Sequence, residues 1–273
     1  MNTKNRPDIA IVGGGAAALM LAAQLDTNQY QVTIYEKNKT PGRKLLVAGN
    51  GGFNLTHGRN IEEMIHEYYP SDFLSECLQN FSNLHLREYL LTLGIPTYIG
   101  SSNRIFPQKG IKPIEVLNAF TTKIHANKVT IKTAFHWKGF QKDGQLLFEH
   151  NGKLSTVQSD YVIFALGGAS WSKTGSKGDW LPYFEQRKIK TQPFQASNCA
   201  FQVDWSKDLL SKIEGQPLKN IALFCADQRR RGELMITAFG LEGSPIYAHS
   251  RCLRQQLKNS SKPQLFLDLK PDL

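Results

Sequence analysis

The opening of the chain alternates short apolar runs with a helical pattern. Residues 8–12 form an apolar run typical of a buried parallel strand, and three glycines follow it at once. Residues 16–25 are rich in Ala and Leu, which predicts a helix, and residues 31–35 predict a second strand that ends at Glu36. The chain therefore opens with one strand–helix–strand unit.

The pattern up to about residue 190 mixes helices with short strands, and the intervening loop at 40–60 is rich in Gly. Helical patterns lie near residues 61–80, 82–93 and 112–126, and strand patterns near 129–131, 134–140, 145–150, 154–158 and 161–165. Turn signals at Asp143-Gly144 and Asn151-Gly152 separate the three strands between 134 and 158, which predicts a small antiparallel meander.

The character of the chain changes after about residue 190. Prolines punctuate short β-like runs at 200–203, 221–225 and 233–237, and a helical pattern at 244–257 precedes a last strand at 265–269. We predict an α/β fold with two domains: residues 1–190, with a parallel sheet plus the antiparallel meander, and a β-rich domain at 191–273.

Composition excludes several classes of protein. The 273 residues are 41% hydrophobic, which is too apolar for a disordered chain. The net charge of +10 is spread along the chain, with one run at Arg229–Arg231, and no nucleic-acid motif accompanies it. We therefore expect no nucleic-acid partner, and the charge indicates a solvated basic surface or, alternatively, attraction of anionic cofactors.

The remaining compositional features argue against special sites. The four cysteines lie far apart, which disfavours a disulfide framework, a cysteine zinc site and a local dithiol, so a cytoplasmic location is expected. The seven histidines show no metal-ligand spacing, so no metal site is predicted. The uncharged segment at 9–25 is too short and too rich in Gly for a membrane span.

The turn after the first strand carries the clearest chemical signal. Gly13, Gly15 and Ala18 match the pattern G-x-G-x-x-G/A, and Glu36 lies 21 residues beyond Gly15 at the end of the next strand. Gly13 permits a tight turn, Gly15 lets the backbone approach a pyrophosphate, and Ala18 keeps the helix close to the strand. Glu36 can accept hydrogen bonds from ribose hydroxyls, and Ala16 and Lys37 flank these positions. The turn predicts dinucleotide binding.

The identity of the dinucleotide depends on two later segments. Glu36 disfavours a 2′-phosphate, which leaves FAD and NAD. FAD is favoured by the loop at 41–57, whose glycines allow close approach and whose cations can neutralise phosphate, and by the late strand ending in a Gly pair. The candidate binding residues in these segments are Gly42, Arg43, Lys44, Gly49, Gly51, Gly52, Asn54, Gly167 and Gly168.

Other residues are weaker candidates. Trp137 lies after the strand at 129–131, where related folds contact adenine through the backbone. His57 lies in the Gly-rich loop and is either a surface histidine or a neighbour of a flavin ring, and Arg104 opens an R-x-F-P stretch that either orders a domain interface or contacts substrate. Three further residues follow the Gly pair and either line a flavin pocket or pack in the core: Trp171, Lys173 and Thr174. No residue is assigned as a catalytic acid or base.

Together these segments resemble the BaiN-type flavoproteins, also called YhiN-like or aminoacetone-oxidase-like. The resemblance rests on segments that occur in the same order over essentially the whole chain: the nucleotide turn, Gly42-Arg43-Lys44, Gly49 to Asn54, Ala165 to Ser170, Gly175 to Asp179, and Gly232-Glu233-Leu234 through Gly240, Gly243 and Ser250. Where the broad family carries Arg-Cys-Asn this chain has Gly52-Phe53-Asn54, so a thiol mechanism in this loop is unsupported.

The resemblance implies a Rossmann-like FAD-binding domain and an FAD-dependent oxidoreductase. A hydride would pass through flavin N5 to or from an unidentified small organic substrate, with NAD(P)H as a transient electron donor. Members of the family continue past the equivalent of Leu273, so the second domain is expected to be incomplete and flavin retention to be affected. An NAD-dependent dehydrogenase and a truncated, non-catalytic flavoprotein remnant stay open as alternatives.

Overall fold

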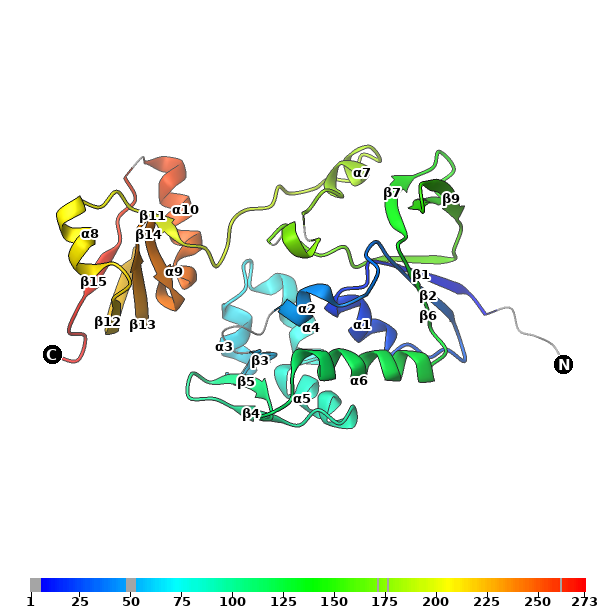
Figure 1. Ribbon diagram of the computed structural model, residues 1–273, viewed down its shortest axis with the longest axis horizontal. Coiled ribbons are helices and arrows are strands. Elements are labelled where there is room, and N and C mark those ends of the chain that lie inside the picture. The colour runs from blue at the N-terminus through cyan, green and yellow to red at the C-terminus, as the bar shows by residue number, and fades with distance from the viewer. Residues whose placement is uncertain (1–5, 48–52, 171, 176, 261) are drawn as a thin grey trace. The chain divides into compact units, whose positions relative to one another are not determined.

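The computed structural model describes residues 6–47, 53–170, 172–175, 177–260 and 262–273 (Figure 1). The chain divides into two compact units, residues 1–192 (unit 1) and residues 193–273 (unit 2), and each is considered by itself. Among the described residues, no helix combines the length and the apolar character that crossing a bilayer requires.

A four-stranded parallel sheet forms the middle layer of unit 1. Its strands are β10 (Tyr161–Phe164), β1 (Asp8–Val12), β2 (Gln31–Glu36) and β6 (Thr130–Thr133), in that order across the sheet. Helices α1 (Ala16–Ala22) and α6 (Pro113–Ala126) cover one face (Figure 1). The meander of β7 (His136–Phe140), β8 (Leu146–His150) and β9 (Lys153–Val157) packs on the other face.

The burial of β1 explains its continuous apolar sequence. Ile9 and Ile11 pack with the helices, whereas Ala10 and Val12 pack with the meander beside Phe148. Successive side chains of a strand point to opposite faces, so a strand with both faces covered needs apolar residues at every position. The α/β class, with a parallel sheet and an antiparallel meander, is confirmed.

The segment between β2 and β6 holds short helices and a small antiparallel sheet. Besides α6, its helices are α2 (Arg43–Val47), α3 (Ile61–His66), α4 (Asp72–Asn80) and α5 (Asn83–Thr92), and its strands are β3 (Thr56–His57), β4 (Thr97–Ile99) and β5 (Arg104–Pro107). The segment after β10 contains the short 3-10 helix η1 (Ser172–Thr174) and helix α7 (Leu181–Glu185).

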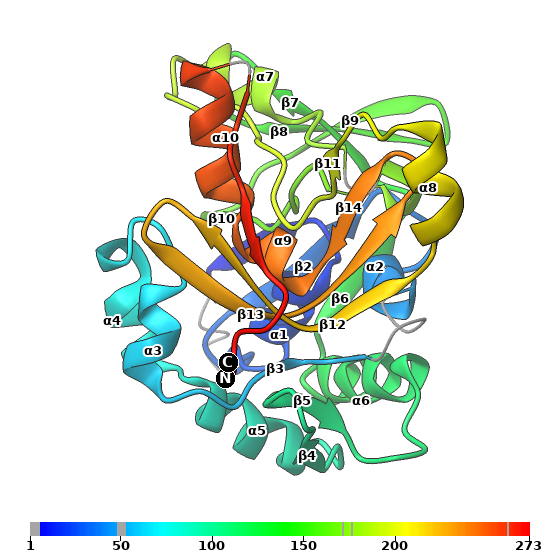
Figure 2. The same ribbon diagram turned by 90° about the vertical axis from the view of Figure 1, so that its left-hand side faces the viewer.

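Unit 2 is built on an antiparallel sheet (Figure 2). Across the sheet the order is β11 (Phe201–Gln202), β14 (Gly240–Gly243), β13 (Gln228–Thr237), β12 (Pro217–Cys225) and β15 (Phe266–Asp268). Its helices are α8 (Lys207–Ile213), α9 (Ser244–Ala248) and α10 (Ser250–Asn259). The core consists of apolar side chains from the two longest strands and from α9: Ile221, Leu223, Leu234, Ile236 and Ile246.

The structure corrects three expectations about local elements. The loop at 40–60 contains the helix α2, and the helical pattern at 61–80 is two helices separated around Pro70, which lacks the N–H that a continuous helix needs. The pattern at 244–257 is likewise two helices, α9 and α10, which meet at the fully buried His249.

One disulfide forms that the cysteine spacing did not lead us to expect. Cys225 and Cys252 form a disulfide between the end of β12 and helix α10, while Cys77 and Cys199 are free. The two bonded cysteines are 27 residues apart in sequence, and only the packing of α10 beside β12 brings them together. Local spacing therefore carried no information about this pair.

Candidate functional site

The carboxyl ends of three strands meet at Gly13. This residue follows β1, has φ of +103°, and donates its N–H to the carbonyl of Tyr35 in β2 at 2.8 Å. A Cβ added to Gly13 would lie 2.4 Å from the carbonyl oxygen of Ala165, which follows β10. Only glycine combines this backbone conformation with such close approach of three strands.

The next two glycines have different surroundings. A Cβ on Gly14 would lie 2.8 Å from Oε2 of Glu36, so the absence of a side chain lets this carboxylate approach the turn. At Gly15, which precedes α1, no atom lies within 4 Å of the Cβ position, and the residue borders an open cavity. Gly13 and Gly14 are therefore needed for packing, whereas Gly15 leaves space in the cavity.

Glu36 is a buried carboxylate held by its neighbours. Only 6% of the residue is exposed. Its Oε2 accepts a hydrogen bond from the backbone N–H of Gly14 at 2.6 Å, and its Oε1 accepts from the backbone N–H and the side-chain amide of Asn38 at 2.7 and 2.5 Å. These bonds offset the cost of removing the charge from water and fix its orientation at the cavity wall.

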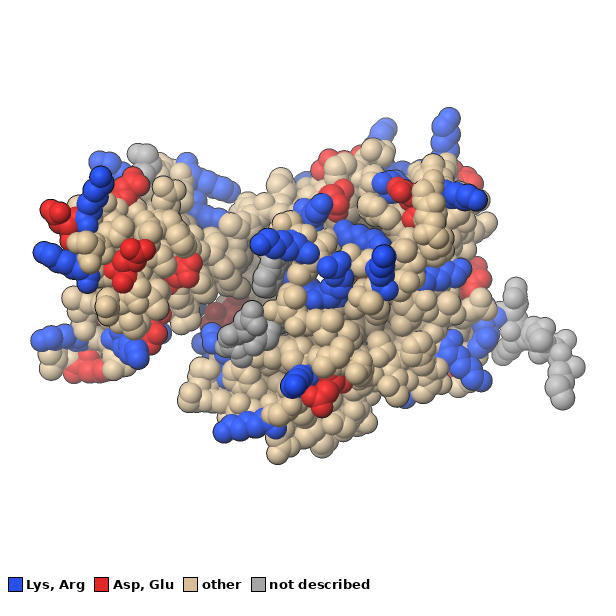
Figure 3. Space-filling model, viewed as in Figure 1, with Lys and Arg blue, Asp and Glu red and all other residues tan. Residues whose placement is uncertain are grey.

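Cationic side chains line one side of the same cavity. Helix α2 supplies Arg43, whose Nη1 donates to Oδ1 of Asn38 at 3.2 Å, and Lys44, whose Nζ donates to Oγ of Ser170 at 2.5 Å. Lys37 lies 3.9 Å from Oδ1 of Asp179. Figure 3 shows Lys and Arg side chains grouped over the part of unit 1 where α2 lies in Figure 1. This arrangement favours an anionic ligand.

The position of α2 follows from Gly42. Its N–H donates to the carbonyl of Gly14 at 2.8 Å, its φ is +68°, and an added Cβ would lie 2.6 Å from a methyl group of Leu117 in α6. A residue with a side chain would push α2 away from the turn and from α6. Gly42 thus sets the distance between the cations of α2 and the turn after β1.

Aromatic side chains occupy another part of the cavity wall. Phe135, Trp137, Trp180 and Tyr183 all line it, and Trp180 donates its indole N–H to the carbonyl of Gly167 at 3.1 Å. The indole nitrogen of Trp137 is buried and has no hydrogen-bond partner among the described residues. Flat apolar walls with a few polar groups are typical of sites that bind a purine ring.

His136 is the titratable group at this end of the cavity. Its pKa is lowered, mainly because burial disfavours the imidazolium and secondarily because Lys138 and Lys37 repel a positive charge. His136 is therefore neutral at physiological pH, so it can act as a hydrogen-bond acceptor or donor without adding to the positive charge of the cavity.

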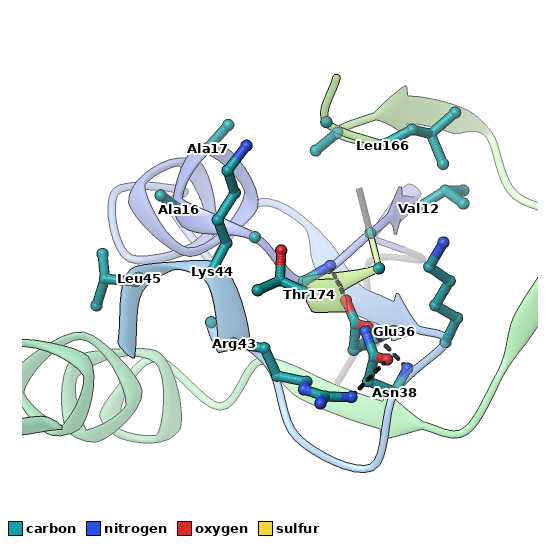
Figure 4. A pocket seen from close by; sticks show the side chains of 18 of the residues that line it. Val12, Ala16, Ala17, Glu36, Asn38, Arg43, Lys44, Leu45, Leu166 and Thr174 are labelled. Carbon is teal, nitrogen blue, oxygen red and sulfur yellow. Dashed lines mark hydrogen bonds between the residues drawn. The ribbon is translucent and has the colours of Figure 1, made fainter. Parts of the chain in front are cut away.

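The cavity has a volume of about 500 Å³, which is within the range of small-molecule sites. It brings together most residues that the sequence singled out, from five separate segments: Gly13, Gly15, Ala16, Glu36, Lys37, Gly42, Arg43, Lys44, Asn54, Trp137, Gly167, Gly168 and Thr174. Figure 4 shows part of this wall, with Glu36 and Asn38 beside Arg43.

Several candidates do not line the cavity. Ala18 is fully buried among the core residues of α1. His57 and Arg104 lie opposite each other on β3 and β5, and the pKa of His57 is lowered by burial and by Arg59 and Arg104. Four candidates lie outside the described residues: Gly49, Gly51, Gly52 and Trp171.

The sequence did not single out three residues that shape the cavity. Gly14 occupies an unspecified position of the G-x-G-x-x-G/A pattern, and Asn38 and Trp180 belong to no sequence pattern. Asn38 carried one usable signal, because a polar residue two positions beyond Glu36 lies at the carboxyl edge of a parallel sheet, where ligands bind.

Comparison with known proteins places this geometry in context. A family model described as the HI0933-like protein Rossmann domain matches residues 7–246. The 3-dehydro-bile acid delta(4,6)-reductase of Clostridium scindens is 26% identical over 282 residues, covering 97% of this chain and 65% of the relative. The ribosomal RNA dihydrouridine synthase of Haemophilus influenzae is 25% identical over 239 residues, covering 86% and 59%.

The chain thus spans 59–65% of the length of these two curated relatives. Among solved structures, Thermovibrio ammonificans THI4 superposes with a TM-score of 0.41 at 19% identity, covering 62% of this chain and 61% of the other.

Proposed function

The chain belongs to the HI0933-like Rossmann domain family, and on that premise we propose that it is the FAD-binding part of a flavin-dependent reductase of conjugated carbon–carbon double bonds. The observation that supports this most strongly is the single cavity where Gly15, the buried Glu36 and the cations of α2 meet. We assign dinucleotide binding to unit 1 and propose that residues 191–273 contribute to the substrate side.

FAD is the cofactor of this family, and the residues present fit it. The open space at Gly15 admits a pyrophosphate against the turn backbone. Arg43 and Lys44 provide positive charge beside it, and Glu36 provides an anionic acceptor for a ribose hydroxyl. The aromatic wall and the unpartnered indole N–H of Trp137 suit adenine, which combines a flat face with ring-nitrogen acceptors.

The names of two relatives suggest the class of reaction. One is named as a reductase of 4,6-unsaturated 3-dehydro-bile acids and the other as a synthase of dihydrouridine in ribosomal RNA. Both names describe the addition of two hydrogens to a carbon–carbon double bond conjugated with a carbonyl group. We propose the same bond type as the target of this protein, with a bile acid or a uracil ring as the two forms to test.

The contribution of the chain itself is binding and orientation. When bound, FAD would provide the hydride chemistry of its N5 for such a reduction, with NAD(P)H as the proposed source of the electrons. The turn, Glu36 and α2 would hold the dinucleotide by its adenosine and pyrophosphate ends and so orient it.

The 273-residue chain tests the proposal directly. After purification with and without added FAD, we expect a yellow protein with the visible bands of oxidised flavin. NADPH and NADH are then added with a 4,6-unsaturated 3-oxo bile acid or with uridine-containing ribosomal RNA, and mass spectrometry measures a gain of two hydrogens in either substrate.

Two results would contradict the proposal. A colourless protein that binds NAD tightly and not FAD would favour the dehydrogenase alternative. A yellow protein that reduces neither substrate would contradict the assigned bond type and leave FAD binding in place. Reduction of the RNA would also overturn the expectation, drawn from charge distribution, that nucleic acid is not a partner.

A further inference from the structure

Asn38 joins the two charged groups that face the ligand. Its side-chain amide donates to Oε1 of Glu36 at 2.5 Å, and its Oδ1 accepts from Nη1 of Arg43 at 3.2 Å (Figure 4). Its own backbone is fixed as well, because its N–H donates to Glu36 at 2.7 Å and its carbonyl accepts from the N–H of Ala134 at 3.0 Å. The side chain therefore stands at a defined point between an anion and a cation.

The chemistry of an amide suits this place. One end of the group is a donor and the other an acceptor, so only one orientation places the NH₂ on the carboxylate and the oxygen on the guanidinium. Both hydrogen bonds involve a charged partner, which makes them stronger than bonds between neutral groups. Among the described residues, Glu36 and Arg43 make no direct ion pair with each other.

We propose that Asn38 is a positioning residue that keeps Glu36 and Arg43 apart as separate ligand groups, one for the ribose and one for the pyrophosphate. Without the amide, the Arg43 guanidinium that Oδ1 of Asn38 now holds would be free to turn toward Oε1 of Glu36 and pair with it. That pair would remove the acceptor from the ribose and the positive charge from the phosphates together. The inference rests on the proposed binding of FAD in this cavity.

The surrounding residues show that the role falls to the side chain of Asn38. An added Cβ on Gly175 would lie 3.4 Å from the amide nitrogen of Asn38, so the segment after η1 packs against this side chain. Lys37, the adjacent cation, lies near Asp179 instead of Glu36. The relay from Gly14 through Glu36 and Asn38 to Arg43 thus links the turn after β1 with helix α2.

The test compares the affinity of ADP, which has the adenosine and pyrophosphate parts of FAD, in matched variants. Asn38→Leu keeps the size of the side chain and removes both hydrogen bonds, whereas Asn118→Leu makes the same change at an exposed position of α6. Calorimetry on the full chain is expected to show ADP binding weakened about 10- to 100-fold in N38L. N118L is expected to bind as the wild type does.

Two further variants separate positioning from a general loss of structure. N38D can accept from Arg43 but cannot donate to Glu36 and repels it, so we expect ADP affinity to fall at least as far as in N38L. If Asn38 acts through Arg43, adding N38L to Arg43→Met weakens ADP binding by less than about threefold, whereas a structural defect lowers affinity by the same factor in both backgrounds.

The outcomes distinguish a failure of the positioning role of Asn38 from a failure of FAD binding in the cavity. If the wild-type chain binds FAD and ADP but N38L or N38D binds ADP within about twofold of it, the positioning role is wrong and the proposed function stands. Equal factors in the wild-type and R43M backgrounds would also overturn the positioning role. If the wild-type chain binds neither FAD nor ADP, the proposed function fails and the role of Asn38 fails with it.

Discussion

The two units differ in how their sheets bring residues together. In unit 1 the strands β10, β1 and β2 are parallel, so their carboxyl ends meet at one edge, where the glycine turn, Glu36 and the Gly167-Gly168 pair collect around a cavity. In unit 2 the strands are antiparallel, so neighbouring strands end at opposite edges. The side chains that this sheet buries form an apolar core.

Buried polar groups show the same difference. In unit 1, Glu36 is held by Gly14 and Asn38 while it borders the cavity. In unit 2, Nε2 of His249 bonds the carbonyl of Leu223 at 3.1 Å, and the hydroxyl of Ser250 donates to the carbonyl of Tyr247 at 2.7 Å. The buried carboxylate of unit 1 thus borders a cavity, whereas these two polar groups of unit 2 bond to backbone carbonyls.

The largest expected effects come from two glycines of the same turn. Gly13→Ala places a methyl group against the carbonyl of Ala165 in a conformation that L-residues avoid, so unit 1 should lose on the order of 4 kcal/mol of stability. Gly15→Val has space for its side chain in the cavity, so the fold should persist while FAD affinity falls by about 100-fold or more. Thermal unfolding and FAD titration measure the two quantities.

The two variants, at positions only two residues apart, distinguish a glycine needed for packing from a glycine needed for binding. A Gly15→Val chain that remains as yellow as the wild type contradicts the placement of the pyrophosphate. A Gly13→Ala chain with unchanged stability contradicts the close approach of β10 to the turn.

In unit 2 the corresponding large effect comes from the disulfide. Replacing Cys252 by Ala opens a loop of 27 residues between bonded positions, and the loss of chain constraint is expected to cost unit 2 about 3–4 kcal/mol. Hydrogen exchange resolved by segment should show faster exchange in β12 and α10 and unchanged exchange in β1 and β2. Cys199→Ala, at a free cysteine, is the control. Equal protection of unit 2 in both variants would contradict a stabilising disulfide.

The sequence predicted the parallel sheet because strands covered on both faces carry continuous apolar runs, as residues 8–12 do. It predicted the glycine turn because close approach of backbones leaves few residue choices at Gly13. Helix α2 escaped prediction because five residues carry almost no periodic signal, and its place depends on the contact of Gly42 with Leu117.

The rest depended on contacts between distant positions. The pairing of Cys225 with Cys252 follows from how α10 packs beside β12, which no local pattern records. The role of Asn38 depends on the orientation of Glu36 and on an arginine five residues later, brought near by a helix that was itself unexpected. A residue whose role depends on neighbours that only the fold brings near is hard to recognise in a single sequence.

Smaller effects are expected at Glu36, where two substitutions distinguish the contribution of its charge from that of its hydrogen bonds. Glu36→Gln keeps the shape of the side chain but replaces an anionic acceptor, so FAD binding should weaken about tenfold. Glu36→Ala also leaves the N–H groups of Gly14 and Asn38 without their acceptor, which should lower the stability of unit 1 by about 1–3 kcal/mol. Calorimetry with FAD and thermal unfolding check both. A Glu36→Ala chain as stable as the wild type would mean that the turn does not depend on the acceptor at Glu36.

The smallest effect is a pH dependence that the two units should express differently. The pKa of His249 is lowered mainly by burial, with a further contribution from Arg230, while its bond to the Leu223 carbonyl opposes the shift. Because the unfolded chain binds the proton more readily, with a pKa near 6.5, the stability of unit 2 should fall as the pH drops below 6.5. The slope cannot exceed about 1.4 kcal/mol per pH unit for one group.

His249→Gln should flatten this dependence, because an amide can still donate to the Leu223 carbonyl and does not titrate. His136 in unit 1 has a pKa lowered by burial and by nearby lysines, and it lines the cavity, so FAD should alter its titration. Segment-resolved hydrogen exchange between pH 7 and pH 5, corrected for intrinsic exchange, measures both units at once. If FAD changed the acid response of unit 2 as much as that of unit 1, the proposal that FAD binds in the cavity of unit 1 and not in unit 2 would be wrong.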